Sequence, residues 1–479
     1  MRFEQLTNLT GKLLLLFSTT FSLPLLFAIY FGELVHPFLV AMIVSAVVGI
    51  VLLITSKNQS ATLESMRHKE AFALVAIAWF LVSILGSIPY LFIGINPVDA
   101  FFESMSGFTT TGASVLTPEC LPRSILVWRS LTQWLGGMGI IMLFLAIIPN
   151  VARKSAIIFQ AEYPGVTLSK VKPKIRDTAL ALYSLYFLFT ILEISILILL
   201  GVSPFDAINH TFTTLSTGGY STHSESIAFF RDERVEAAIV IFAFIGGTNF
   251  ALLYFLLRGD LRIVKDPEFR FYVLFLLVAS LTISVLNLKK FTLLESLRYS
   301  IFQVVSIMTT TGYTTYDFDL WSDSSRLILL TLMFIGGCSG STGGGIKVIR
   351  VYLLIRYAII QILRAAEPRT IRTVKFGDKS IRKEYLDDIA AFFVLYIFIF
   401  TISSLIIALS GYDIVTSISA TAATLGNVGP GLGLAGAGEN YHSFLPHVKL
   451  LLCLDMWIGR LEIFTVISLF IPSFWRERW

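Results

Sequence analysis

Four short segments of the sequence combine hydroxyl side chains with glycine in the same order. They read SGFTTTGAS (106–114), FTTLSTGGYS (212–221), SIMTTTGYT (306–314) and TLGNVGPG (424–431). Glycine reaches backbone dihedral angles that are costly for other residues, so successive carbonyl groups beside it can point the same way. A ring of such carbonyl oxygens can replace the water shell of a cation. The chemistry predicted is coordination of a dehydrated cation by the backbone.

A second glycine-containing motif follows each segment at a similar distance. These motifs read WLGGMG (134–139), FIGGTN (244–249), FIGGCS (334–339) and WIGRLE (457–462). We align the first motifs on Gly112, Gly218, Gly312 and Gly429, which gives spacings of 24, 28, 24 and 30 residues. A single threonine-glycine cluster is also typical of close helix packing in membranes. Four ordered copies favour a fourfold internal repeat around a pore.

The composition indicates a membrane protein. Of 479 residues, 55% are hydrophobic and only 14% charged, against about 25% charged residues in soluble domains. Ten apolar runs are long enough to cross about 30 Å of hydrocarbon, at 12–31, 37–55, 71–94, 124–149, 179–202, 237–257, 271–288, 325–349, 389–410 and 448–471. We therefore predict an all-α membrane protein with ten transmembrane helices.

These helices are expected to form an N-terminal two-helix hairpin and four covalent repeats of helix, pore loop and helix, as in potassium channels. The predicted units are the hairpin 1–60 and the repeats 61–152, 153–260, 261–365 and 366–479. Two pore loops begin like helices, NPVDAFFESMSGF (96–108) and SPFDAINHTFTTL (203–215), with proline and aspartate in the first turn. About 12 helical residues rise roughly 18 Å, half of the membrane. The partially negative C-terminal ends of such half-helices favour a cation at the membrane centre.

The placement of basic residues predicts the orientation. Of 37 Lys and Arg, 27 lie at the termini or in the alternate loops 56–70, 151–178, 258–270 and 347–383. By the positive-inside rule these segments are cytoplasmic, as are both termini of a multi-pass protein of the cell (inner) membrane. The loops 151–178 and 347–383 carry 6 and 10 basic residues, which are explained by topology and by contact with anionic membrane lipids. We expect no nucleic acid partner.

The third motif continues as GGCSGSTGGGIK (336–347), with six glycines in ten residues of an apolar run. A continuous helix is disfavoured there because each interior glycine costs about 1 kcal/mol relative to alanine. Irregular backbone at membrane depth is tolerated where it lines a cavity. We predict a gating loop at 338–345, with Gly340, Gly343, Gly344 and Gly345 as its movable residues; a static break in packing is the alternative.

Arg460 replaces the second glycine of the motif in the fourth repeat. An arginine at the centre of a span costs about 2.5 to 3.5 kcal/mol and is a functional candidate. Facing the pore axis it would repel a permeating cation. The alternative is a buried ion pair with one of four carboxylates, Asp455, Glu462, Glu193 or Glu103.

On these motifs, residues 71–471 resemble the Trk/Ktr/HKT superfamily of cation transporters, and the extra hairpin resembles its bacterial TrkH branch. The resemblance implies a potassium filter, and Gly112 favours potassium because sodium-conducting relatives tend to have serine there. It also implies the gating loop and an arginine barrier at Arg460. The implied potassium-binding residues are Thr110, Thr111, Gly112, Ser216, Thr217, Gly218, Thr310, Thr311, Gly312, Asn427, Val428 and Gly429.

The resemblance further implies a homodimer with one pore per chain and a cytoplasmic nucleotide-binding regulatory ring of the TrkA type. Potassium ions are the expected ligands, with no organic cofactor. The predicted function is gated potassium uptake driven by the membrane potential; a sodium-permeable pore or an ion-coupled secondary transporter is the alternative, although such transporters usually show inverted repeats. An enzyme is not expected, because the sequence has no HExxH, GxSxG or clustered carboxylates.

Overall fold

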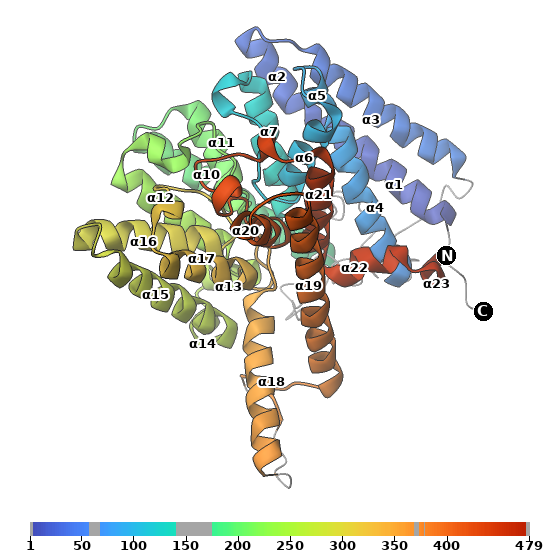
Figure 1. Cartoon of the computed structure of the whole chain (residues 1–479). Helices are drawn as coiled ribbons and strands as arrows, with labels where there is room; N and C mark the ends of the chain where they lie inside the picture. Colours follow the sequence, from blue (N-terminus) through green and yellow to red (C-terminus); the bar gives the residue numbers. More distant parts are fainter. Residues whose placement is uncertain (1–2, 57–67, 140–174, 368–372, 378, 476–479) are drawn as a thin grey trace.

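The computed structural model is built almost entirely of helices (Figure 1). It describes residues 3–56, 68–139, 175–367, 373–377 and 379–475. The end of the expected span 124–149, most of the expected loops 56–70 and 151–178, and the basic residues Arg476 and Arg478 lie outside the described residues.

The N-terminal hairpin consists of α1 (Phe3–Ser18), η1 (Thr19–Phe21), α2 (Ser22–Phe31) and α3 (His36–Thr55). Helices α1 and α3 lie side by side. They approach closely at two facing glycines, since a β-carbon on Gly11 would lie 2.8 Å from the Gly49 carbonyl oxygen. Small residues at helix contacts are the usual means of close packing in membranes.

Four short helices, here called half-helices, each end just before one of the four segments that combine hydroxyl side chains with glycine: α6 (Pro97–Phe108), α11 (Pro204–Leu215), α16 (Leu293–Met308) and α20 (Ile414–Leu425). Each is capped by a side-chain oxygen that accepts a hydrogen bond from an amide in the first turn; the caps are Asn96, Ser203, Thr292 and Asp413. The two half-helices predicted from proline and aspartate are confirmed.

Longer outer helices precede the half-helices: α4 (His68–Gly86) with α5 (Ile88–Leu91), α10 (Ile175–Leu199), α15 (Pro267–Asn287) and α19 (Lys383–Leu409). Together with the two long stretches of the N-terminal hairpin, they make six helices long and apolar enough to cross a membrane within the described residues. One further pair, bent by 106°, raises that number to seven. The prediction of ten spans is thus only partly matched by continuous helices.

The helices that follow the half-helices are short or interrupted, where the sequence predicts continuous spans. They are α7 (Arg123–Gly137), α12 (Glu233–Gly246) bent against α13 (Phe250–Leu256), α17 (Asp323–Ile335) separated from α18 (Val348–Ala366), and α21 (Pro446–Leu461) followed by α22 (Ile463–Ile467). The interruptions fall at the second glycine motif, where Gly336 and Glu462 have positive φ angles of 77° and 68°. Such angles cannot continue a right-handed helix.

The first half of the predicted connection 347–383 forms helix α18. A small antiparallel hairpin, β1 (Lys375–Phe376) and β2 (Lys379–Ser380), follows it and pairs Lys375 with Ser380. Figure 1 shows α18 and the first turns of α19 projecting beyond the rest of the molecule. The remaining short elements are η3 (Pro118–Cys120), η4 (Ser226–Phe230), α14 (Arg262–Lys265), η5 (Phe318–Leu320), η6 (Gly433–Ala435), η7 (Tyr441–Ser443), η8 (Ser468–Phe470) and α23 (Pro472–Trp475).

A buried ion pair joins the first half-helix to the last long helix of the chain. Lys449 Nζ in α21 lies 2.6 Å from Asp99 Oδ1 in α6, and both side chains are 5% exposed. The pair connects residues 350 positions apart. A buried charge that loses its partner is strongly destabilising, because it stays desolvated without compensation.

We therefore expect Asp99→Asn to lower the free energy of unfolding by about 3 kcal/mol, since Lys449 is then left unpaired. The double variant Asp99→Asn/Lys449→Met should recover much of this loss. Thermal unfolding of the purified protein in detergent measures both. The exposed pair Arg262–Asp260 supplies the control, as Arg262→Gln should have little effect. Equal losses in the single and double variants would show that the pair does not act as described.

Candidate ion filter and the loop beneath it

Four three-residue segments, here called the filter triplets, share one backbone conformation: 110–112, 217–219, 310–312 and 427–429. The first residue of each has a positive φ, at Thr110 (53°), Thr217 (53°), Thr310 (62°) and Asn427 (54°). The third is a glycine with positive φ, at Gly112 (81°), Gly219 (76°), Gly312 (78°) and Gly429 (100°). The amides of the first two residues bond back to the preceding half-helix with the same spacing in all four cases.

The structure corrects the alignment of the second of these segments by one residue. The sequence alignment placed Gly218 opposite Gly112, but the backbone places Gly219 there. Ser216, a predicted filter residue, instead follows the end of α11 and donates its hydroxyl to the Phe212 carbonyl at 2.7 Å. Two consecutive glycines made the alignment ambiguous, and the φ angles decide it. The other three predicted triplets coincide with the filter triplets.

The filter triplets form a closed ring. A β-carbon added to the glycine of one triplet would lie 2.6 Å or less from the middle carbonyl oxygen of the next triplet. The contacts run in chain order, and the last triplet contacts the first. The glycine and the carbonyl that it approaches are Gly112 and Gly218, Gly219 and Thr311, Gly312 and Val428, and Gly429 and Thr111. Segments more than 300 residues apart are thereby brought to one site.

The surroundings of the ring suit a cation. The half-helices α6, α11, α16 and α20 all end within two residues of a filter triplet, so their partially negative ends are directed at it. A cavity of about 340 Å³ opens on the ring, and its lining includes all four triplet glycines. It is also lined by Ser114, Arg129 and Tyr220.

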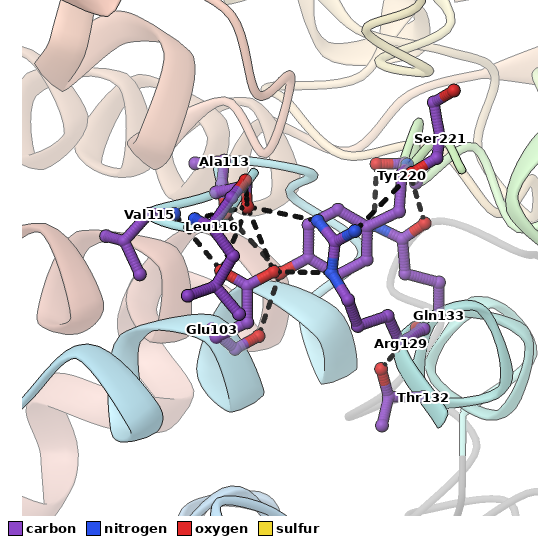
Figure 2. Close-up of polar contacts among 11 residues, drawn as sticks. Glu103, Ala113, Val115, Leu116, Arg129, Thr132, Gln133, Tyr220 and Ser221 are labelled. Carbon is purple, nitrogen blue, oxygen red and sulfur yellow. Dashed lines mark hydrogen bonds and ion pairs between the residues drawn. The ribbon is translucent and has the colours of Figure 1, made fainter. Parts of the chain in front are cut away.

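A buried ion pair supports the first two triplets. Arg129 Nε in α7 lies 2.7 Å from Glu103 Oε1 in α6, and Glu103 also accepts the Val115 amide at 3.1 Å (Figure 2). The Tyr220 hydroxyl donates to the Glu103 carbonyl at 2.8 Å, with the Arg129 guanidinium 4.2 Å from the Tyr220 ring. Sequence reasoning considered Glu103 only as a partner of Arg460 and missed Arg129, whose signal was a charged residue inside the expected span 124–149.

The segment 336–347, here called the glycine-rich loop, lies beneath the ring and is irregular throughout, as predicted. Thr342 Oγ1 donates to the Leu215 carbonyl at 2.8 Å, and Gly344 N donates to Thr310 Oγ1 at 2.7 Å. A β-carbon on Gly344 would lie 2.8 Å from that of Asn427. The loop therefore contacts the end of α11 and the third and fourth filter triplets.

Among the predicted gating residues, Gly340 and Gly345 have positive φ angles of 75° and 74°, which only glycine adopts readily. Gly343 lies close to the third triplet, since a β-carbon there would be 2.9 Å from the Thr309 carbonyl. Gly344, next to it, is the residue that donates to Thr310. The predicted glycines thus include both the bends of the loop and its closest approach to the ring.

Arg460 connects the glycine-rich loop to the C-terminal end of α7. Its Nη1 donates to the Thr342 carbonyl at 2.7 Å, and its Nη2 donates to the Gly136 and Gly137 carbonyls at 2.7 and 3.0 Å.

Three of the carboxylates considered as partners of Arg460 are engaged elsewhere. Glu462 accepts from Arg350 at 2.7 Å, Asp455 from Ser403 at 2.8 Å, and Glu103 from Arg129. A cavity of about 40 Å³ beside Arg460 is lined by Gly343, Gly345 and Lys347.

Comparison with known proteins identifies the family. Residues 36–477 match the TrkH family of cation transport proteins. The chain belongs to the TrkH family. It is 37% identical to the Trk system potassium uptake protein TrkH of Salmonella typhimurium, with 100% of both chains covered. It is 32% identical to the Trk system potassium uptake protein TrkG of Escherichia coli, over 98% of each chain.

The fold is also that of a solved family member. The crystal structure of the potassium transporter TrkH from Vibrio parahaemolyticus superposes with a TM-score of 0.89 at 35% identity, and the match covers 99% of this chain and 100% of that one. The resemblance stated from the filter segments and the N-terminal hairpin is thus confirmed.

We expect Gly112→Ser to increase sodium flux relative to potassium flux, because a β-carbon there would displace the Gly218 carbonyl and deform the ring. Fluxes of the two ions into vesicles containing the purified protein measure this effect. Gly94→Ser is the matched control, since Gly94 has nearly the same φ of 82° but nothing within 4 Å of its β-carbon position. Unchanged selectivity in Gly112→Ser would contradict the filter assignment.

Proposed function

We propose that the protein takes up potassium ions through the ring of filter triplets, driven by the membrane potential. The closed ring of four like backbone segments, at the ends of four half-helices, is the observation that carries the proposal. Relatives over the full chain length are named as potassium uptake proteins, which supports potassium as the ion. The proposal includes ten spans, four repeats and cytoplasmic termini in the inner membrane.

Carbonyl oxygens of the first two residues of each triplet are the proposed ligands of a dehydrated potassium ion. These residues are Thr110, Thr111, Thr217, Gly218, Thr310, Thr311, Asn427 and Val428. Eight neutral oxygens stabilise a monovalent cation without binding it so tightly that conduction stops. The fourth triplet is unlike the others, and Pro430 beside it lies close to Gly312; this asymmetry favours a sodium-permeable pore as the second candidate.

The glycine-rich loop is the proposed gate. It lies beneath the ring, and Arg460 and Lys347 bring two basic side chains to its lower side. A unit charge 10 Å from a permeating ion raises the ion's energy by about 1.7 kcal/mol at an effective dielectric constant of 20. This repulsion slows leak without closing the pore, so closure requires the loop itself.

Regulation from the cytoplasm is part of the proposal. The relatives are named as parts of a Trk system, which supports partner subunits; we infer a homodimer with a nucleotide-binding ring of the TrkA type. Helix α18 is continuous with the glycine-rich loop and projects from the molecule (Figure 1). It offers a lever by which a bound partner could move the loop. Anionic lipids are expected to contact its basic residues.

We expect the protein to restore growth of a potassium-uptake-deficient strain on low potassium, and to carry potassium faster than sodium into vesicles. Vesicles without protein are the control. Equal fluxes of the two ions would favour the sodium-permeable pore. Failure to carry either ion, with growth restored on an organic nutrient, would favour an ion-coupled secondary transporter instead.

We expect Arg460→Ala to raise basal potassium flux severalfold, because it removes both a charge near the pore and the hydrogen bonds that hold Thr342. Arg460→Lys separates the two effects: it keeps the charge but cannot span the carbonyls of Thr342 and Gly136. Flux in planar bilayers at several voltages is the measurement. A current-voltage curve of Arg460→Ala identical to that of the unmodified protein would leave Arg460 with a structural role only.

A further inference from the structure

The second filter triplet lacks a side chain that the other three have. The middle residue is Thr111, Thr311 or Val428 in the first, third and fourth triplets, but Gly218 in the second. Gly218 is not among the residues with positive φ, so its backbone conformation does not require glycine. Its missing side chain needs a different explanation.

Gln133 in α7 fills the space where that side chain would stand. A β-carbon on Gly218 would lie 2.5 Å from Gln133 Oε1 and 2.8 Å from Nε2. Gln133 is completely buried. The amide of one repeat thus takes the place of a filter side chain in the next repeat.

Both ends of the Gln133 amide bond to the backbone of the second return segment. Nε2 donates to the Gly218 carbonyl at 2.7 Å, and Oε1 accepts the Tyr220 amide at 3.0 Å (Figure 2). The Gly218 carbonyl is the one that lies against Gly112 in the ring. One of the four middle carbonyls is therefore tethered by a side chain from outside the triplet.

The equivalent positions in the other repeats are apolar. Gln133 stands three residues before Gly136, and the residues three before Gly246, Gly336 and Gly459 are Ala243, Met333 and Met456. Ala243 and Thr311 line the same small gap, and Met333 and Val428 belong to one apolar cluster. In the third and fourth triplets the middle side chain therefore has an apolar helix residue in its surroundings, whereas the filter glycine has glutamine.

We propose that Gln133 is a positioning residue that sets the selectivity of the pore by fixing the Gly218 carbonyl. The proposal rests on the ring conducting potassium. A carbonyl oxygen has two lone pairs, so it can accept from Gln133 and still face an ion. The tether limits how far this carbonyl can move inward, as coordination of the smaller sodium ion would require. Glycine is the most mobile backbone residue, so this carbonyl gains most from being held.

Gln133→Met tests the tether, because it keeps a side chain of similar size and removes both hydrogen bonds. We expect the potassium-to-sodium permeability ratio, measured from reversal potentials in planar bilayers, to fall about threefold to tenfold. This range corresponds to the one hydrogen bond that Gln133 donates to the Gly218 carbonyl. Potassium conduction itself should persist. A ratio equal to that of the unmodified protein, with potassium current present, would overturn the proposal.

A double variant supplies the rescue. Gln133→Ala/Gly218→Thr recreates the pairing of Ala243 with Thr311, and we expect its ratio to return to within about twofold of the unmodified protein. Gln133→Ala alone should lower the permeability ratio because it leaves a cavity. Gly218→Thr alone should lower the ratio because the new side chain clashes with Gln133. A double variant no more selective than Gln133→Ala, together with a Gln133→Met variant as selective as the unmodified protein, would contradict the proposal. Absence of potassium current in the unmodified protein would instead refute the proposed function.

Discussion

The contact of backbone on backbone within the ring is the constraint on which the rest of the structure depends. Each triplet glycine approaches the carbonyl of the next triplet too closely for any side chain. Because the contacts close on themselves, all four half-helices must end at one height. The second glycine motif meets this requirement: a β-carbon on Gly136, Gly246 or Gly459 would lie 3.1 Å or less from the carbonyl of Phe108, Leu215 or Leu425. This geometry therefore accounts for glycine both in the filter triplets and in the second glycine motif.

The third copy of the second glycine motif departs from the pattern, and the glycine-rich loop begins there. Gly336 faces the Gly344 carbonyl instead of a half-helix, so α17 ends and irregular backbone occupies the space beneath the ring. The buried Glu268 carboxylate accepts the Ser339 amide at 2.6 Å and the Ile349 amide at 3.2 Å, which fixes the loop near both ends. The contacts of the loop with α11 and the ring lie between these two anchoring bonds.

Much of this arrangement could be predicted from the sequence, because it is encoded locally. Proline and aspartate mark two half-helix starts, and the triplets are marked by threonine and glycine. What failed depends on three-dimensional context. Whether Gly218 or Gly219 is the third residue of the second triplet depends on which of them has a positive φ angle. The sequence does not decide this, because both residues are glycines. The partners of Arg460 were sought among carboxylates, yet the structure supplies carbonyls freed by broken helices, which no list of side chains reveals. Gln133 passed unnoticed among several polar residues of α7.

A single chain with four unlike filter triplets can adjust each corner of the ring, that is each triplet, separately, which a tetramer of identical subunits cannot do. At the second corner Gln133 replaces a missing side chain. Where the fourth triplet meets the first, Asn427 Nδ2 donates to Thr111 Oγ1 and to the Met456 carbonyl, each at 3.0 Å. Asn427 thus joins these two triplets. These two amides hydrogen-bond at the corners where the triplets depart most from threonine-threonine-glycine. Asymmetry in the sequence is thus compensated by side-chain hydrogen bonds, and the backbone of the ring keeps the same conformation at all four corners.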